Sequence, residues 1–444
     1  MSWRPLACCL AFVASLCSCE GTSEKGLRPD ASIYNELTHT AAIDNHAHPG
    51  KLLARGEEDV DADALPPDAI SDLALPTPML DGSPFLPEAR RAMFHLNASG
   101  GPMSKTQSEA LRRKRDDLQR SEGDGYPAWV LNETKTAVML ANRVAMGRGL
   151  SGDRFKWVPF VDTFLFPLQN KSYKNRDPEH AAFFTREEGL LSGYLQASGH
   201  RRLPTTFDDY LMFVSHQLES WKGAGAVALK FELAYLRDLK IGNPTRESAE
   251  RVYAIYSQSS EPTPDEYRIL QDYLFRYIST EAGRLSLPIH IHSSLGTGSY
   301  FLSSNANPLE LEGVFNDPAL RRTKFVLLHG AWPFAREAAM LILKPNVYLD
   351  FSAFYFLTYP AGGSKALRLY LESAPEKVLY GSDASPWGNG IGWEETVWLG
   401  SHNGRLALAL ALSDMVRDRE ITVDRAKKIG HMALYDNAHA LYGF

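Results

Sequence analysis

The segment AAIDNHAHPG, residues 41–50, decides which fold we expect for this chain. An apolar run, Ala-Ala-Ile, leads into an aspartate and then into two histidines, His46 and His48, that are one residue apart. Side chains at positions i and i+2 of a strand point to the same side, so both imidazoles would share one face of a sheet. The pattern indicates either a metal-binding strand end or a polar patch where a strand stops.

Short apolar runs of this kind recur along the chain and are separated by segments of helix length. We expect strands at residues 41–49, 136–143, 155–164, 225–232, 287–294, 324–330, 346–353 and 377–385. Strands that alternate with helices predict parallel βαβ units, and eight such units predict a closed (β/α)8 barrel, or TIM barrel, of the α/β class.

We assign residues 31–444 to this barrel, with long insertions after the first and third strands, at about residues 50–135 and 168–224. In a barrel, such loops lie over the active face and would contribute substrate contacts. The alternative is a separate small helical domain, which a chain of 444 residues is long enough to contain.

The first nineteen residues contain all four cysteines of the chain and an apolar run from Leu6 to Leu16. This layout is typical of a secretory signal peptide, which we place at residues 1–18. The alternative, a membrane-spanning anchor, would need about 20 apolar residues. The sequence LCSC, which ends at Cys19, resembles the lipobox of bacterial lipoproteins and predicts a lipidated Cys19 at the start of a tether over residues 19–30. We therefore expect export to the bacterial envelope, as a periplasmic or membrane-anchored lipoprotein.

The amino-acid composition limits the binding partners and the catalytic residues that we expect. Hydrophobic residues make up 44% of the chain and charged residues 23%, as in a soluble globular protein. The net charge of −6 is mild and no long Lys/Arg run occurs, so we expect a small-molecule substrate and no nucleic acid. The membrane would be contacted only through the lipid anchor, and the oligomeric state is not indicated. Because no cysteine follows Cys19, cysteine nucleophiles and cysteine metal sites are excluded from the folded body.

Polar side chains stand at the ends of four more of the expected strands. They are Lys230, with Glu232 on the same strand face, then His290 and His292, His329, and Asp383. The carboxyl ends of barrel strands meet at one face, so these side chains would converge although they are distant in sequence. Imidazole and carboxylate groups together suit zinc or a similar divalent ion.

This order of residues resembles the ligand order of the amidohydrolase superfamily: His-x-His on the first strand, Lys on the fourth, His on the fifth and sixth, and Asp on the eighth. The segments HIHSSLG, KFVLLHGAWPFAREAAML, KVLYGSDASP and DNAHALYGF are similar to the amidohydrolase-related branch, amidohydrolase 2, and particularly to the module associated with glutamine synthetase. The resemblance covers the first strand and residues 226–444.

The resemblance implies a metal-dependent hydrolase of the amidohydrolase type that cleaves a C–N or related bond in a small molecule. One divalent ion, expected to be zinc, would be held by His46, His48, His292 and Asp383 and would activate a water molecule. Asp383 would take the proton of that water and pass it to the leaving group.

Two further residues decide whether the site holds one ion or two. His329 would either bind a second ion or polarise the substrate carbonyl. Lys230, if carboxylated, would bridge two ions, with His292 and His329 on the second one; unmodified, its ammonium would bind an anionic group of the substrate. Both arrangements stay open.

Several alternatives accompany this interpretation. On the fifth strand we prefer His292 over His290 as the ligand, because it lies nearer the carboxyl end of the strand. The residues expected to bind substrate are Tyr235, Arg237, Trp332 and Arg336. Because fold does not determine chemistry, a metal-dependent non-oxidative decarboxylase and a non-catalytic envelope binding lipoprotein are the alternative functions.

Overall fold

The computed structural model describes residues 28–54, 56–65, 83–97, 103–258, 260–296, 298–387 and 390–444. The predicted signal peptide, Cys19 and most of the predicted tether lie outside the described residues. No helix in the described part of the chain combines the length and the apolar character that crossing a membrane requires.

All eight predicted strands are present, and each lies inside its predicted run. They are β1 (Ala42–Ala47), β2 (Thr136–Asn142), β3 (Phe155–Val158), β4 (Leu229–Phe231), β5 (Ile289–Ile291), β6 (Phe325–Leu327), β7 (Val347–Asp350) and β8 (Val378–Leu379). Most strands are shorter than the predicted runs, and His292, His329 and Asp383 lie in the segments that follow β5, β6 and β8. All neighbouring strands pair in parallel.

The strands close into a cylinder. Strands β1-β2-β3 and β4-β5-β6-β7-β8 form two ladders, and backbone hydrogen bonds join these ladders at both edges. Between β3 and β4, the backbone nitrogen of Lys230 donates to the carbonyl oxygen of Pro159 (2.9 Å). Between β8 and β1, the backbone nitrogen of Asp383 donates to the carbonyl oxygen of His46 (2.7 Å). The predicted (β/α)8 barrel is thereby confirmed.

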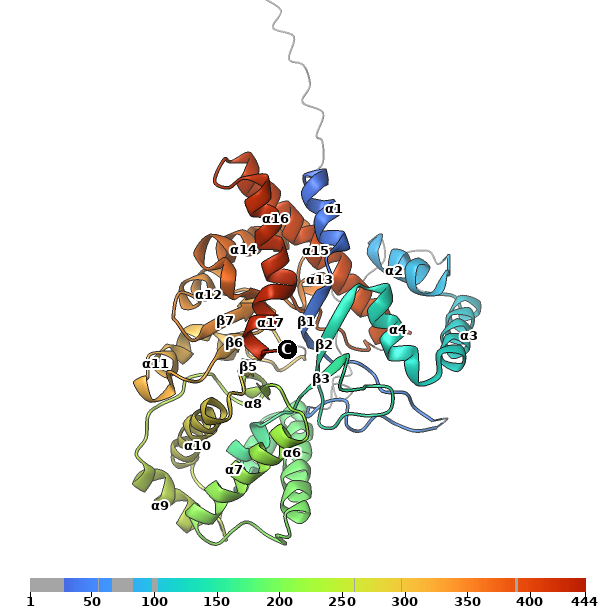
Figure 1. Cartoon of the computed structure of the whole chain (residues 1–444). Coiled ribbons are helices and arrows are strands. Elements are labelled where there is room, and N and C mark those ends of the chain that lie inside the picture. The colour runs from blue at the N-terminus through green and yellow to red at the C-terminus, as the bar shows by residue number, and fades with distance from the viewer. Residues whose placement is uncertain are drawn as a thin grey trace, which may run out of the picture.

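Helices surround the barrel, and Figure 1 shows α1 and α16 at one end of the molecule and α6, α7 and α9 at the other. The helices that flank and connect the strands are α1 (Ala31–His39), α4 (Tyr126–Glu133), α8 (Leu233–Leu236), α9 (Arg246–Tyr256), α10 (Pro264–Leu285), α11 (Glu312–Phe315), α12 (Ala335–Leu341), α13 (Phe354–Leu357), α14 (Pro360–Ser373), α15 (Trp393–Arg417), α16 (Val423–His431) and α17 (Asn437–Tyr442). The start of α10 shows why the sequence folds this way: Thr263 and Glu266 form a capping box around Pro264 at the first helical position.

The two long insertions carry the remaining helices. These are α2 (Phe85–Phe94) and α3 (Lys105–Glu122) in the first insertion, and α5 (Lys171–Lys174), α6 (Pro178–Ala197) and α7 (Phe207–Gly223) in the second. Phe184 of α6 and Trp221 of α7 belong to the same buried apolar cluster as Leu229 of β4. The helices of the second insertion therefore pack into the core that surrounds the strands.

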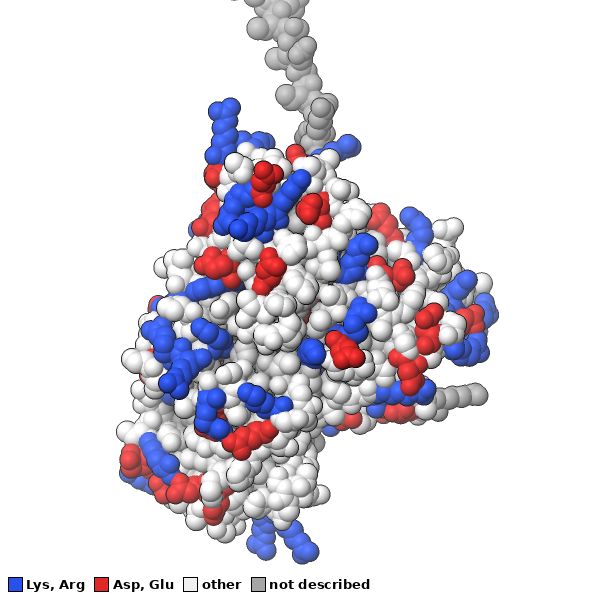
Figure 2. All heavy atoms as spheres, in the orientation of Figure 1, with Lys and Arg blue, Asp and Glu red and all other residues white. Residues whose placement is uncertain are grey.

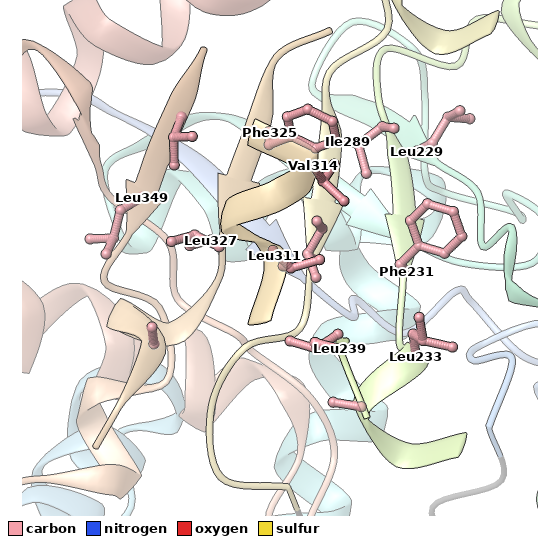
Figure 3. Close-up of a cluster of buried hydrophobic side chains, with 14 of the residues drawn as sticks. Leu229, Phe231, Leu233, Leu239, Ile289, Leu311, Val314, Phe325, Leu327 and Leu349 are labelled. Carbon is pink, nitrogen blue, oxygen red and sulfur yellow. The ribbon is translucent and has the colours of Figure 1, made fainter. Parts of the chain in front are cut away.

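Alternation along the strands separates the core from the barrel interior. Leu229 and Phe231 of β4 point outward, and the Phe231 ring stacks on Phe275 of α10 at a centroid distance of 4.7 Å. Figure 3 shows these outward side chains together with those of β5, β6 and β7. Because neighbouring positions alternate in direction, Lys230 and His290 point into the barrel. The outer surface is mixed in charge, and on the face shown in Figure 2 acidic and basic side chains are interspersed.

Candidate functional site

Three predicted ligands meet at the carboxyl ends of β1 and β8. Nε2 of His46 lies 3.2 Å from Oδ1 of Asp383, and Nε2 of His48 lies 3.7 Å from the same oxygen. One ligand atom of each residue lies within 4.8 Å of those of the other two. Ligand atoms that share one divalent ion at bond lengths of about 2.0–2.2 Å are roughly 3–3.6 Å apart. The donor set and its spacing therefore fit one metal ion.

Close packing at the end of β8 positions Asp383. Its backbone has a φ of 56°, in the left-handed region, and two residues earlier Gly381 approaches the neighbouring strand. A Cβ on Gly381 would lie 2.8 Å from the Cβ of Ser352, so only glycine fits there. The backbone nitrogen of Ser382 donates to Oδ1 of Asp44 (2.8 Å), which ties the turn to β1. The strained position of Asp383 is thus held by contacts with both adjacent strands.

His329 and His292 form a second row beside this group. Nδ1 of His329 lies 3.6 Å from Oδ2 of Asp383, and its Nε2 lies 3.1 Å from Nδ1 of His292. Nε2 of His292 lies 3.2 Å from the carbonyl oxygen of Ser294. His329 therefore adjoins His46 and Asp383 directly, whereas His292 reaches them through His329.

Lys230 lies in the barrel interior on the other side of His46. Its Nζ is 3.5 Å from Nε2 of His46 and 4.0 Å from Oε1 of Glu232, and the residue is 1% exposed. His290, the alternative ligand on β5, bonds instead through Nε2 to the Tyr442 hydroxyl (2.7 Å). This contact directs His290 toward the C-terminal helix rather than toward the ligand group.

Burial sets the protonation of these groups. It lowers the pKa of His46, His292 and His329 well below the ordinary value, helped by the charge of Lys230. Neutral imidazole is the form that binds a metal ion. Burial raises the pKa of Asp383 to about 6. In the absence of an ion, this carboxyl can take up and release a proton close to neutral pH.

The four predicted substrate-binding residues are placed differently. The Tyr235 ring lies 4.6 Å from the His292 ring, so it borders the site. The carbonyl oxygen of Trp332 accepts a hydrogen bond from Ser294, in the loop after β5. The Arg237 guanidinium is directed to Asp272, at 2.8 Å.

Arg336, the fourth of these residues, is exposed on α12. The structure thus brings Tyr235 to the rim of the site, whereas for Trp332 it shows a backbone contact with the loop after β5. The buried guanidinium of Arg237 instead forms an ion pair with Asp272 on a neighbouring helix.

A chain of hydrogen bonds that was not predicted from the sequence connects the C-terminal helix to the backbone of His329. The Tyr442 hydroxyl donates to Oδ1 of Asn45, whose side-chain nitrogen donates to Oδ2 of Asp350 (2.7 Å). Oδ1 of Asp350 accepts from the backbone nitrogen of His329 (2.9 Å). Tyr442 thus reaches the barrel interior and joins the C-terminal helix to the site. The sequence feature that could have indicated this chain of hydrogen bonds is Asp350, a polar residue near the end of the seventh predicted strand.

Known proteins share this fold and part of this sequence. Residues 251–444 match the protein-family model described as amidohydrolase. Protein fluG of Emericella nidulans is 27% identical over 228 residues, which are 49% of this chain and 25% of that protein. The match therefore spans about a quarter of the curated relative's length.

Solved structures resemble the chain along nearly its whole length. A Lactobacillus casei protein described as a metal-dependent hydrolase has a TM-score of 0.59 and 15% identity, with 94% of this chain and 98% of that one covered. The uronate isomerase of Thermotoga maritima has a TM-score of 0.54 and 14% identity, with coverages of 93% and 96%. At these identities the likeness establishes the fold alone.

Proposed function

Since the chain belongs to the amidohydrolase superfamily, in its amidohydrolase 2 branch, we propose that it is a metal-dependent hydrolase acting on a C–N or related bond of a small molecule. The observation that carries the proposal is the convergence of His46, His48 and Asp383 around one point at the mouth of the barrel. These donors are neutral nitrogens and a carboxylate oxygen, the set that zinc prefers in catalytic sites.

Each residue of the site has its own role in the proposed hydrolysis. His46, His48 and Asp383 would hold the divalent ion, which supplies an acidified water when bound. Asp383 would also be the group that accepts the proton of that water and returns it to the leaving group. His329, which lies 3.6 Å from the Asp383 carboxyl, would polarise the substrate carbonyl.

Lys230 remains the residue that distinguishes one ion from two. Its Nζ lies beside Nε2 of His46, so an ammonium there would bind an anionic substrate group and a carbamate would reach a second ion. Mass measurement of the intact, zinc-grown protein separates these states, because carboxylation adds the mass of carbon dioxide.

The test combines metal analysis with a substrate panel of amides, lactones and aromatic acids. We expect about one or two zinc ions per chain and zinc-dependent release of carboxylic acid from a member of the panel. Asp383→Asn should lower the rate by at least a hundredfold while the melting temperature measured with a chelator is kept, and exposed Asp153→Asn should change neither. Release of carbon dioxide from aromatic acids, with amides and lactones untouched, would overturn the proposal in favour of a decarboxylase.

A further inference from the structure

Beside the proposed ion site lies a second group of acidic side chains that the hydrolytic chemistry does not use. Nε2 of His48 faces Asp383, whereas Nδ1 of the same ring lies 3.0 Å from Oδ2 of Asp63. One ligand atom each of His48, Asp63 and Glu232 lies within 4.8 Å of the others. The backbone nitrogen of Glu232 donates to Oδ2 of Asp162 (2.8 Å), which adds a third carboxyl.

Glu187 of α6 is the fourth carboxyl, and the four form what we call the acidic group. Asp63 comes from the loop after β1, Asp162 from the turn after β3, and Glu232 from the residue that follows β4. The Thr163 hydroxyl, next to Asp162, donates to the backbone carbonyl oxygen of Glu187 (2.7 Å), so Glu187 lies beside Asp162. Four separate segments therefore bring carboxyls to one place beside the ion site.

Several buried oxygens of the acidic group lack donors. Within the described residues, Oδ1 of Asp162, Oε2 of Glu232 and both oxygens of Glu187 have no hydrogen-bond partner. These three residues are 1%, 6% and 2% exposed. A buried acceptor without a donor is costly, and several together are a sign of a missing cationic or donor-rich partner.

The cationic side chains of Lys230 and Arg186 lie near the acidic group, but neither donates a hydrogen bond to the unpartnered oxygens. Nζ of Lys230 stays 4.0 Å from Oε1 of Glu232. The Arg186 guanidinium donates to the backbone carbonyl oxygens of Val60 and Asp63. The Asp63 side chain is 20% exposed, so a ligand can approach from the solvent side.

We propose that the acidic group binds a protonated amino group of the substrate, so that the substrates are small amides or related compounds that carry a free amine near the cleaved bond. An ammonium has three N–H donors and no acceptor, which complements a set of carboxylate oxygens. The cleaved bond would lie at His46, His48 and Asp383, and the amine beyond His48. The assignment of the bond rests on the proposed hydrolytic function, whereas binding of the amine does not.

A second divalent ion is the competing occupant, and the geometry favours it less. It would have to use Nδ1 of His48 while Nε2 of the same ring stays in the first ion site. It would also stand near the Lys230 side chain, whose unmodified ammonium repels a doubly charged ion more strongly than a singly charged amine.

The test measures binding of two matched probes, L-alaninamide and N-acetyl-L-alaninamide, to the zinc-loaded full chain by saturation-transfer NMR. We expect the dissociation constant of L-alaninamide to be at least tenfold lower than that of the acetylated probe. Glu187→Gln and Glu232→Gln should each weaken L-alaninamide at least tenfold, and Glu250→Gln, at an exposed position on α9, should leave it unchanged. Thermal melting verifies that each variant is folded.

Three results would overturn the inference. They are equal affinity for the two probes, full L-alaninamide binding by folded Glu187→Gln and Glu232→Gln, and a wild-type chain with two zinc ions that loses one in Glu232→Gln. Amine-selective binding without hydrolysis of any probe would support the amine site and count against the hydrolase proposal alone, so the two failures are distinguishable.

Discussion

Nε2 of His46, near the end of the first strand, lies 3.2 Å from Oδ1 of Asp383, which follows the last strand. The same two residues share a backbone hydrogen bond of 2.7 Å between the Asp383 nitrogen and the His46 oxygen. One seam thus closes the barrel and builds the proposed ion site. Binding of an ion should for this reason be coupled to the stability of the closed barrel.

Zinc should stabilise the wild-type chain through this seam. At a free zinc concentration a thousandfold above the dissociation constant, the expected gain is about 4 kcal/mol. His46→Ala should lose most of this gain, and His439→Ala, at an exposed position, should keep it. Calorimetric melting with zinc and with a chelator measures both. An equal zinc-induced rise of the melting temperature in His46→Ala would contradict the assignment of this ligand.

Tyr442→Phe should weaken the site without changing any ligand. The substitution removes the donor to Asn45 and the partner of His290, and loss of such buried hydrogen bonds costs about 1–3 kcal/mol. Because Asn45 also holds Asp350, which holds His329, we expect a lower kcat with little change in KM. Tyr435→Phe on the neighbouring turn is the matched control. Unchanged kcat in Tyr442→Phe would mean that the hydrogen-bond chain serves stability alone.

Arg237→Ala should act on stability rather than on substrate affinity. The Arg237 side chain is 3% exposed and pairs with Asp272, and removing one partner of a buried ion pair costs about 3–5 kcal/mol. Arg336→Ala, at an exposed position, should change stability by less than about 0.5 kcal/mol. Urea unfolding gives both values. A raised KM in Arg237→Ala at unchanged stability would restore the role expected from the sequence.

Glu395, at the contact between α3 and α15, should make stability fall as the pH rises. Burial raises its pKa to about 7, although the Arg115 guanidinium beside it acts in the opposite direction. In the unfolded state the Glu395 carboxyl loses its proton near pH 4.3, whereas in the folded state it keeps the proton up to about pH 7. The stabilisation is therefore complete below about pH 4.3 and is lost as the pH rises through about 7. The free energy of unfolding should fall by about 3 kcal/mol between pH 4 and 8.

Glu395→Gln should remove this part of the pH dependence, because the amide resembles the protonated carboxyl. Urea unfolding of both proteins at several pH values measures the difference. Parallel stability curves for wild type and Glu395→Gln would show that the carboxyl is already ionised in the acid range.

Anchoring at the envelope remains a proposal from the sequence, and it can be tested separately. Cys19→Ser removes the thiol that a lipid would modify. In a bacterial host, we expect wild-type protein to incorporate labelled palmitate and to sediment with membranes, and the variant to do neither. Equal incorporation of label by both proteins would exclude Cys19 as the lipidation site.

Much of the barrel was predictable because its signals are local. An apolar run that ends in a polar residue identifies a strand and its carboxyl end, and this holds for β1 with His46 as it does for β8 with Asp383. Parallel strands bring those ends together whatever their separation in sequence. The fold and the set of candidate ligands could therefore be derived without coordinates.

The acidic group and the ion pair of Arg237 could not be predicted, because they depend on how loops and side chains pack in the folded chain. Asp63 and Glu187 lie in insertions with no strand pattern, so no periodicity linked them to Glu232. Arg237 follows a ligand strand but turns to Asp272, and His292 reaches the group only through His329. Such choices follow from packing and hydrogen bonding between segments far apart in the chain. The sequence by itself determined which strands form the barrel and which polar residues end them, whereas the tertiary structure alone decided which charges face each other, because that depends on long-range contacts.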